Sequence, residues 1–148
     1  MINICKNCGK ETSKFKSSNH PRIYCSIRCQ HDFQYRQNIK DWLSKKITGK
    51  KRDGRPSDFV RKYMLKEANN KCSQCGWGQP NPFNGIVYLE IDHIDGTREN
   101  GYRDNLRVLC PNCHTLTDTY KTLNKNVGYH KSRKLSQQSE SNNEANLD

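Results

Sequence analysis

Four polar side chains in the second half of the chain have the types and order expected of a site for metal-assisted hydrolysis. Asp92 and His93 are neighbours, and Asn105 follows them after a turn-rich loop. His114 comes last and directly follows Cys113. A carboxylate oxygen and an imidazole nitrogen can bind one divalent ion and leave most of its coordination shell for phosphate oxygens and water. We therefore expect Asp92 and His114 to be the ligands of a catalytic ion.

The other two side chains suit proton transfer and positioning. His93 has an ordinary pKa of about 6.5, so a neutral imidazole is available near pH 7 to take a proton from an attacking water. Asn105 can hydrogen-bond the loop beside it, or it can fix the tautomer of the imidazole. Each of these residues also has a structural interpretation, since an isolated Asp-His pair often only holds a loop and His114 could be a neighbour of the cysteines. Their occurrence together, around a cysteine quartet, favours the catalytic interpretation.

Each of the eight cysteines has another cysteine three or four positions away, as in metal-binding knuckles. A structural zinc site is expected from four regularly spaced thiols: Cys72, Cys75, Cys110 and Cys113. Four thiolates close the coordination shell of zinc, so these cysteines hold structure and do not react. A second structural zinc site is expected from the first four thiols: Cys5, Cys8, Cys25 and Cys29. His20 or His31 could replace one thiol there, and disulfides are the less favoured alternative.

The composition explains why the chain needs metal. Leu, Ile, Val and Phe make up 26 of the 148 residues, too few for an apolar core of ordinary size. A structural zinc ion can contribute on the order of 10–16 kcal/mol of apparent binding free energy, comparable to the net stability of a domain. The net charge is +11, and because the last 14 residues hold three acids and no Lys or Arg, residues 1–134 carry +14. A polyanion is the expected partner, with a merely soluble surface as the alternative.

A helix over about 26–46 is expected beside the first cysteine quartet. Cys25 and Cys29, four positions apart, would share one face at its start. An apolar stripe follows at helical spacing: Tyr35, Ile39, Trp42, Leu43 and Ile47. Residues 48–56 have the composition of a linker, whose basic side chains could instead touch phosphates. These elements predict a small zinc module of knuckle, hairpin and helix.

Two strands and a helix are expected to position the catalytic residues. A helix that begins near Ser57 or Asp58 comes first, with three packing residues: Phe59, Tyr63 and Met64. Alternating apolar residues then predict a strand over 85–92, and a second strand is expected over 105–110. Pro111 suits the first position of the final helix. Neighbouring strand residues point to opposite faces, so Asp92 and His93 can serve different partners.

At these residues the sequence resembles the HNH endonucleases. The run LEIDHIDG and the later run NLRVLCPNCHTLTDTYKTLN are similar to the motifs of small phage-type members, in which a four-cysteine zinc site braces the catalytic hairpin. The specific similarity spans about 72–125, and YCSIRC with the following helix extends it loosely over about 1–130. The resemblance implies that His93 is the general base and that Asp92 and His114 bind the catalytic ion. It matches Asn105 to the middle motif residue, which either binds the ion or orients His93.

The implied fold class is a small, zinc-stabilised α+β protein. It has a ββα-metal (HNH) nuclease domain preceded by a small zinc-knuckle and helix module. The expected divisions are the zinc module at 1–47, a basic linker at 48–56, the nuclease domain at 57–130 and a disordered polar tail at 131–148.

The implied activity is metal-dependent hydrolysis of DNA phosphodiester bonds, with Mg²⁺ or Mn²⁺ at the catalytic site and Zn²⁺ at two structural sites. A monomer or weak dimer is expected to bind double-stranded DNA through five basic side chains: Arg98, Arg103, Arg107, Lys121 and Lys125. A non-catalytic zinc protein that binds DNA or RNA is the alternative. No apolar run suits a membrane span or a signal peptide. We therefore expect the protein in the cytoplasm, that of the host cell if a phage encodes it, and the sequence does not rank roles such as intron homing.

Overall fold

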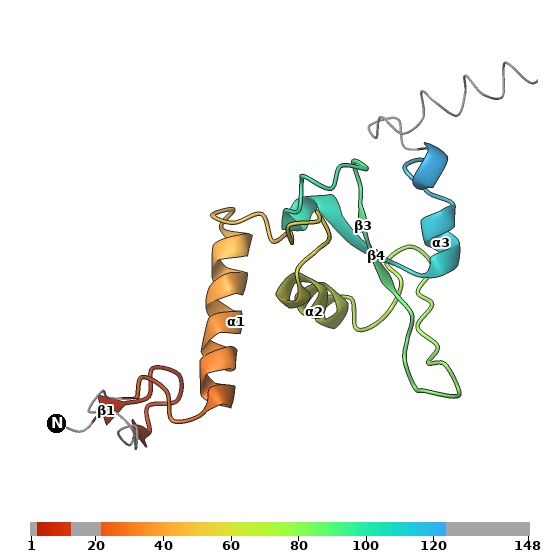
Figure 1. The fold of residues 1–148 in the computed structure, drawn as a ribbon. Helices are drawn as coiled ribbons and strands as arrows, with labels where there is room; N and C mark the ends of the chain where they lie inside the picture. The colour runs from red at the N-terminus through yellow and green to blue at the C-terminus, as the bar shows by residue number, and fades with distance from the viewer. Residues whose placement is uncertain (1–2, 13–21, 124–148) are drawn as a thin grey trace, which may run out of the picture. The chain divides into compact units, whose positions relative to one another are not determined.

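The computed structural model describes residues 3–12 and 22–123. The chain divides into two compact units, Met1–Ile47 and Thr48–Asp148, each with its own fold (Figure 1). The sequence-based expectations for His20, Lys125 and the tail at 131–148 concern residues outside this described part. Among the described residues, no helix is both long enough and apolar enough to cross a membrane.

The first unit begins with a two-stranded hairpin. β1 (Asn3–Ile4) pairs antiparallel with β2 (Glu11–Thr12), and the turn between them carries Cys5 and Cys8. Gly9 closes this turn at a φ of +72°, a backbone conformation that residues with a side chain rarely adopt. Its N–H donates to the carbonyl of Cys5 at 3.0 Å. The hairpin therefore presents two thiols as a knuckle.

The helix expected over about 26–46 is confirmed as α1 (Ile27–Leu43). Ser26 caps it, because its Oγ accepts a hydrogen bond from the N–H of Cys29 at 3.1 Å. The helix ends earlier than expected, and Lys45 already has a positive φ of 59°. Cys25 lies before the cap, so the expectation that Cys25 and Cys29 share a helical face is wrong, and only Cys29 belongs to the helix.

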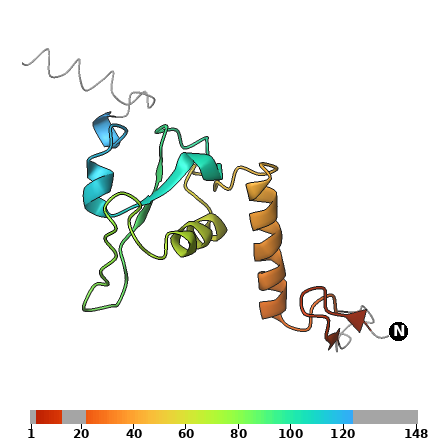
Figure 2. The ribbon, with the colours of Figure 1, turned by 180° about the vertical axis from the view of Figure 1, so that it is seen from behind.

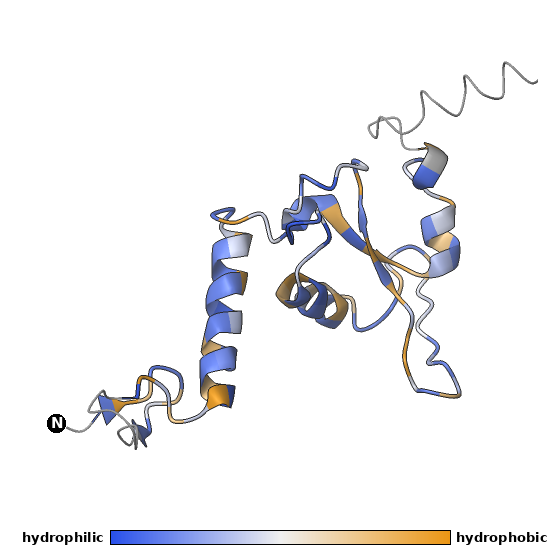
Figure 3. Cartoon of the chain, in the orientation of Figure 1, coloured by the Kyte–Doolittle hydropathy of each residue, from blue (hydrophilic) through white to orange (hydrophobic). Residues whose placement is uncertain are grey.

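The apolar stripe expected along α1 forms only a small core. Trp42 is fully buried, whereas Leu43 and Ile47 expose 45% and 38% of their surface. Figure 3 shows the helix as mostly hydrophilic. Most of α1 is therefore a polar surface helix, which depends on its capping and on the cysteine knuckle beside it for its position.

The second unit begins with a hydrogen-bonded loop at 48–56. The N–H of Lys51 donates to the carbonyl of Arg55 at 2.7 Å, and the N–H of Gly54 donates to the carbonyl of Lys51 at 3.0 Å. Gly54 has a φ of +81°, and a Cβ there would lie 2.9 Å from the Cβ of Arg98. This segment, whose composition is that of a linker, thus folds as a tight turn, because two backbone hydrogen bonds hold it and the lack of a side chain at Gly54 leaves room for Arg98.

The next element is α2 (Asp58–Glu67), which confirms the helix expected from Ser57 or Asp58. Val60 and Met64, four positions apart, are its buried residues, and the helix contacts β4 of the sheet described next. Phe59 and Tyr63 were expected in the core but are only half-buried. The expected packing was correct for Met64 and missed Val60.

A second antiparallel hairpin forms the centre of this unit. β3 (Glu90–His93) pairs with β4 (Leu106–Leu109), with Asp92 opposite Arg107 and His93 opposite Leu106. Residues opposite one another share a face of the sheet. The register therefore places the side chains of Asp92 and Arg107 on one face, and that of His93 on the other.

The first strand is shorter than the expected range 85–92, whereas the second is confirmed as β4. Gly85 has a φ of +69°, and its N–H donates to the carbonyl of Asn81 at 2.8 Å, so the chain makes a turn there. Asn105 also differs from expectation. It ends the 3-10 turn η1 (Arg103–Asn105) and does not open the strand.

The last helix is α3 (Pro111–Thr115), which starts at a Cys110 cap with Pro111 in its first position, as expected. It contacts both strands of the hairpin. α2 and α3 lie on opposite sides of this hairpin (Figures 1 and 2). The 3-10 turn η2 (Lys121–Leu123) completes the described part. The unit is a small α+β fold, whose hairpin is flanked by helices.

Candidate active site and metal centres

The four cysteines of the second unit converge on one point. One sulfur from each lies within 4.8 Å of the others: Cys72, Cys75, Cys110 and Cys113. Cys110 links the cluster to α3, since its Sγ accepts from the N–H of Cys113 at 3.4 Å. The Sγ atoms of Cys75 and Cys110 are 3.7 Å apart. Four sulfurs bound tetrahedrally to zinc at about 2.3 Å lie about 3.8 Å from one another, so this donor set fits a structural zinc ion.

The thiols of this cluster differ in acidity. Burial opposes the ionisation of Cys72, but hydrogen bonds from backbone N–H groups, that of Cys75 first, outweigh it and lower the pKa of Cys72 to about 6. The hydrogen bond to Cys75, together with burial, raises the pKa of Cys113 to about 12. Sulfurs this close cannot all ionise unless a cation shares their charge, which is a further reason why the cluster suits zinc.

A similar cluster lies in the first unit. Its four sulfurs also lie within 4.8 Å of one another: Cys5, Cys8, Cys25 and Cys29. The Sγ of Cys25 is 3.5 Å from that of Cys8 and 3.4 Å from that of Cys29. These hydrogen bonds, that of Cys29 first, raise the pKa of Cys25 to about 12. His31 is exposed and is not part of this cluster, so within the described residues the donor set is four thiols.

The structure brings Asp92 and His114 together on one face of the β3–β4 hairpin. The Nε2 of His114, on α3, lies 3.6 Å from the Oδ1 of Asp92. The Asp92 side chain is 8% exposed and that of His114 is 24% exposed. Two ligands bound at about 2.1 Å to one divalent ion lie roughly 3.0–3.6 Å apart, so the pair fits such an ion.

Two further residues fix the orientation of this pair. Glu90 precedes Asp92 by two positions on β3, and its Oε2 is paired with the Nδ1 of His114. A carboxylate only accepts, so Nδ1 donates to Glu90, and Nε2 is the nitrogen that remains to bind a metal. The Nε of Arg107 donates to the Oδ2 of Asp92 at 2.8 Å. An unprotonated Nε2 and a carboxylate oxygen would repel one another without a cation between them, so a metal ion bound there would satisfy both groups.

Sequence reasoning missed the role of Glu90 in this arrangement and gave Arg107 a different one. The signal for Glu90 was present, because strand alternation puts residues 90 and 92 on the same face. Arg107 could be placed only with the strand register, which the sequence does not specify.

His93 lies at the end of β3 and is 9% exposed. Its Nε2 is buried and has no hydrogen-bond partner among the described residues. Burial lowers the pKa of His93 below its ordinary value, and Arg98 adds to this effect, although the charges of Asp95 and Asp92 oppose it. The imidazole is therefore neutral at pH 7. A neutral imidazole with an unpartnered nitrogen is able to accept a proton.

Asn105 is bound to the loop that follows β3. Its Nδ2 donates to the Oδ1 of Asp95 at 2.9 Å and to the carbonyl of Asn100 at 2.7 Å, and its Oδ1 accepts from the N–H of Asp95 at 3.1 Å. Asp95 also accepts from the N–H of Thr97 at 2.8 Å. Hydrogen bonds from Thr97, Asn105 and Asn100 outweigh the effect of burial and lower the pKa of Asp95. Of the roles that the sequence left open for Asn105, this geometry fits the holding of the loop, and no bond from Asn105 to His93 is found among the described residues.

The arginines expected to contact DNA are not all available for it. Arg103 pairs with Glu67 at 2.5 Å, and Arg107 pairs with Asp92. Arg98 is exposed, and the Nζ of Lys121 lies 4.9 Å from the centre of the Tyr120 ring. Arg98 and Lys121 are thus the exposed members of that set among the described residues.

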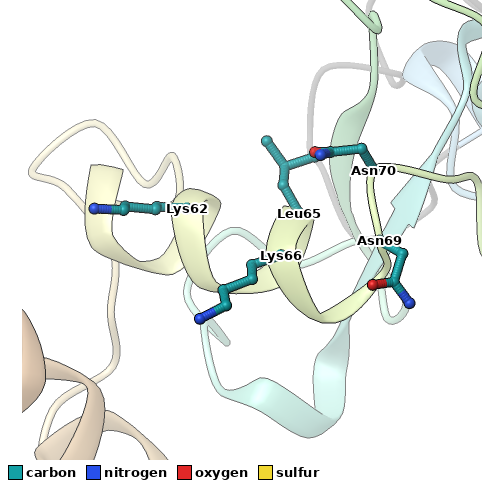
Figure 4. Close-up of a pocket in the computed structure, with 5 residues that line it drawn as sticks. All are labelled: Lys62, Leu65, Lys66, Asn69 and Asn70. Carbon is teal, nitrogen blue, oxygen red and sulfur yellow. The ribbon is translucent and has the colours of Figure 1, made fainter.

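A surface hollow of about 480 Å³ lies along the C-terminal half of α2 (Figure 4). Its lining residues are Lys62, Leu65, Lys66, Asn69 and Asn70. The amino groups of Lys62 and Lys66 extend away from Asn70 (Figure 4). The lining has no carboxylate, imidazole or thiol. The hollow thus lacks the groups for hydrolysis, which gather on the β3–β4 hairpin and α3.

Comparison with known proteins identifies the region that contains these groups. The family model described as HNH endonuclease matches residues 72–118. The H-N-H endonuclease F-TflIV of Escherichia phage T5 is 43% identical to the chain over 68 residues. This similarity covers 43% of the chain and 26% of the phage protein, so the chain spans about a quarter of the length of that curated relative. No solved structure matches the chain.

Proposed function

We propose that this chain, whose residues 72–118 match the HNH endonuclease family model, is a nuclease that hydrolyses phosphodiester bonds of double-stranded DNA with the help of a divalent metal ion. One observation carries the proposal. The Oδ1 of Asp92 and the Nε2 of His114 lie 3.6 Å apart. Arg107 holds Asp92 and Glu90 holds His114. The buried His93 directly follows Asp92 in the chain. The resemblance drawn from the sequence points to the same residues. These residues also lie inside the region that the family model matches.

Asp92 and His114 would hold the catalytic ion, either Mg²⁺ or Mn²⁺. When bound, such an ion supplies a Lewis acid that polarises a phosphate oxygen and stabilises the charge of the transition state. Arg107 occupies Oδ2 of Asp92, so Oδ1 is the oxygen directed at the site. Glu90 holds the proton of His114 on Nδ1 and keeps the lone pair of Nε2 directed at the same place.

His93 would act as the general base. Its lowered pKa keeps it neutral, and its Nε2 is free to accept the proton of a water that attacks phosphorus in line with the departing 3′ oxygen. A positioned base of this kind contributes about 10²–10⁴-fold to the rate. The products would carry 5′-phosphate and 3′-hydroxyl ends. Asn105 serves by holding the loop after His93 through its bonds to Asp95.

The two cysteine clusters would each bind one structural zinc ion. In the second unit, zinc would fix the junction of β4 and α3, where Cys110 directly follows the strand and Cys113 directly precedes His114. This position explains how a chain with few apolar residues can place catalytic groups. In the first unit, zinc would join the β1–β2 knuckle to the start of α1.

The proposed partner follows from charge and from the site. A net charge of +11 favours DNA, whose phosphates would be contacted by exposed side chains such as Arg98 and Lys121. A single metal site acts on one strand at a time, so a monomer would nick and a weak dimer on DNA would be needed for a double-strand break. The cytoplasm, that of the host cell for a phage-encoded protein, is the proposed location.

Incubation of the purified, zinc-loaded protein with supercoiled plasmid tests the proposal. We expect conversion to nicked or linear DNA with Mg²⁺ or Mn²⁺, none with EDTA, and loss of cleavage in His93→Ala and His114→Ala. The alternative, a non-catalytic zinc protein that binds DNA or RNA, predicts a shift of the plasmid in gels with no new ends under any metal. That result would overturn the nuclease proposal.

A further inference from the structure

The first unit has a strong positive charge, and most of the side chains of its helix α1 are polar and lie outside a core. Residues 1–47 contain ten Lys and Arg and three Asp and Glu, a net charge of +7. Two thiolate charges in excess of a bound zinc ion would still leave this unit at about +5. Such a charge attracts a polyanion, so the exposed side chains of α1 are candidates for contact with one.

One face of α1 is used to hold the helix on the cysteine knuckle. Cys29 belongs to the four-thiol cluster, the ring of Phe33 lies 5.6 Å from that of Tyr24, and the Nη2 of Arg36 donates to the Oδ1 of Asn7. Positions 29, 33 and 36 follow the spacing of one helical face. This inner face fixes the direction in which the rest of α1 points within its unit.

The face turned away from the knuckle carries a row of neutral polar side chains among apolar ones. At about 100° per residue, His31, Gln34 and Asn38 lie opposite the knuckle, and Gln30 lies at the edge of that side. Three apolar or aromatic residues share this side: Ile27 is exposed, Tyr35 is half-buried and Trp42 is fully buried. Gln30, His31 and Gln34 are exposed and Asn38 is half-buried, so the polar part of this face lies between residues 30 and 38. The Nε2 of Gln34 donates to the Oδ1 of Asn38 at 2.9 Å, so these amides form a row along the helix.

The side chains of this outer face have the chemistry that reads base edges. A Gln or Asn amide can donate to and accept from one adenine in the major groove, and that groove admits an α-helix. Lys and Glu are the usual choices for a helix surface that only needs to be soluble, and neither occurs on this side of α1 between residues 30 and 38. Arg28, exposed at the flank of the same face, can contact a phosphate.

We propose that the outer face of α1 inserts into the major groove of double-stranded DNA and selects the sequence that the protein binds. The inference rests on the proposed function, because it assigns the recognition of duplex DNA to the unit that does not contain the nuclease site. Gln34 and Asn38 read bases, Gln30 and His31 extend the row, and Arg28 contacts the backbone. The zinc cluster then serves to hold the knuckle behind the reading helix.

Selection of duplexes from a library with a randomised segment tests this proposal. The full-length, zinc-loaded protein is used in buffer without Mg²⁺ or Mn²⁺, and the bound fraction is sequenced. We expect wild-type protein to enrich a short motif. The double variant Gln34→Ala with Asn38→Ala should lose discrimination at one or two adjacent base pairs, by roughly 5- to 150-fold each. Its helix should persist, because Ala is the better helix former.

Two matched variants separate base reading from other effects. Gln79→Ala removes an exposed Gln of the second unit and should leave the motif unchanged. Arg28→Ala should weaken binding to all sequences alike and lower the slope of log K against log salt by about one, whereas the neutral double variant should leave that slope unchanged.

Two outcomes would overturn the proposal. One is an identical enriched motif for wild type and the double variant, and the other is no sequence preference in the wild type. Nicking of supercoiled plasmid at low salt, measured in parallel, keeps this failure distinct from that of the nuclease. If nicking persists while the motif is absent or unaffected, the inference about α1 fails and the nuclease proposal stands.

Discussion

The two four-cysteine clusters arrange their thiols in a similar way but differ in the residues and elements that lie beside them. In the second unit, three of the four cysteines are buried. The strand and the helix that meet at Cys110 carry Arg107, which pairs with Asp92, and His114. In the first unit only Cys5 is buried, and the cluster leads into a long helix with a polar outer surface. Similar four-thiol clusters can therefore lie beside a buried site in one unit and beside an exposed helix in the other.

Arginines of the two units also differ in whether they are paired with carboxylates. In the second unit Arg103 and Arg107 are paired with carboxylates, so they maintain the fold and the site. In the first unit Arg28 is exposed at the flank of the outer face of α1. Catalysis is thus expected to depend on the second unit and the selection of a DNA sequence on the first, and this separation can be tested by breaking each cluster in turn.

The largest effect is expected from Cys110→Ser. It removes one zinc ligand and the cap of α3, and the apparent free energy of zinc binding, about 10–16 kcal/mol, exceeds what a small core can replace. Zinc content should fall from two ions to one per chain, and plasmid nicking should be lost. The equivalent change in the first cluster, Cys25→Ser, should also remove one zinc but leave metal-dependent nicking at low salt. Zinc analysis and nicking assays measure both, and equal loss of nicking in the two variants would contradict the separation.

The second effect is a loss of rate of about 10²–10⁴-fold in His93→Ala, the contribution of a positioned base. Because His93 is buried, His93→Gln is a necessary companion that fills more of the space. Both variants should keep two zinc ions and wild-type affinity for duplex DNA, and added imidazole should restore part of the rate to His93→Ala. Single-turnover cleavage gives the rate, and an unchanged rate in both variants would remove His93 from the mechanism.

Local sequence signals predicted the helix starts and the cysteine clusters well. Ser26, Ser57 and Pro111 stand at the beginnings of α1, α2 and α3, because the residue types preferred there depend on a few adjacent residues, although only the side chain of Ser26 makes a capping hydrogen bond among these two serines. Each quartet could be predicted because close pairs of thiols have few other uses in one chain. The proximity of Asp92 and His114 also followed from order alone, since a hairpin and a helix joined at Cys110 must bring them near one another.

Features that depend on long-range packing were not predictable. The pairing of Arg107 with Asp92 needs the register of β3 and β4, and a shift of one residue would have turned Arg107 to the other face. The direction of Asn105 depends on the loop from Asp95 to Asn100, which has no regular pattern. The exposure of α1 was missed because its apolar residues are spaced like those of a buried helix, while only Trp42 is buried.

A third, smaller effect is expected from loss of the pairing between Glu90 and His114 in the second unit. Glu90→Ala should weaken the binding of the catalytic ion by about 10–100-fold, because His114 would lose the carboxylate that fixes its tautomer. Glu90→Gln keeps an acceptor oxygen and should lose less. The Mg²⁺ concentration for half-maximal nicking measures the effect. Half-maximal concentrations that match wild type in both variants would show that Glu90 does not position His114.

The smallest effect compares the caps of the helices in the two units. The Oγ of Ser26 accepts from the N–H of Cys29, so Ser26→Ala should lower the free energy of unfolding of the first unit by about 0.5–2 kcal/mol. Ser57 occupies the same position before α2, but its buried Oγ has no hydrogen-bond partner among the described residues. Ser57→Ala removes an unsatisfied hydroxyl and should leave the stability of the second unit unchanged or slightly raised. Urea unfolding of the zinc-loaded variants measures both, and a larger loss from Ser57→Ala than from Ser26→Ala would reverse the comparison.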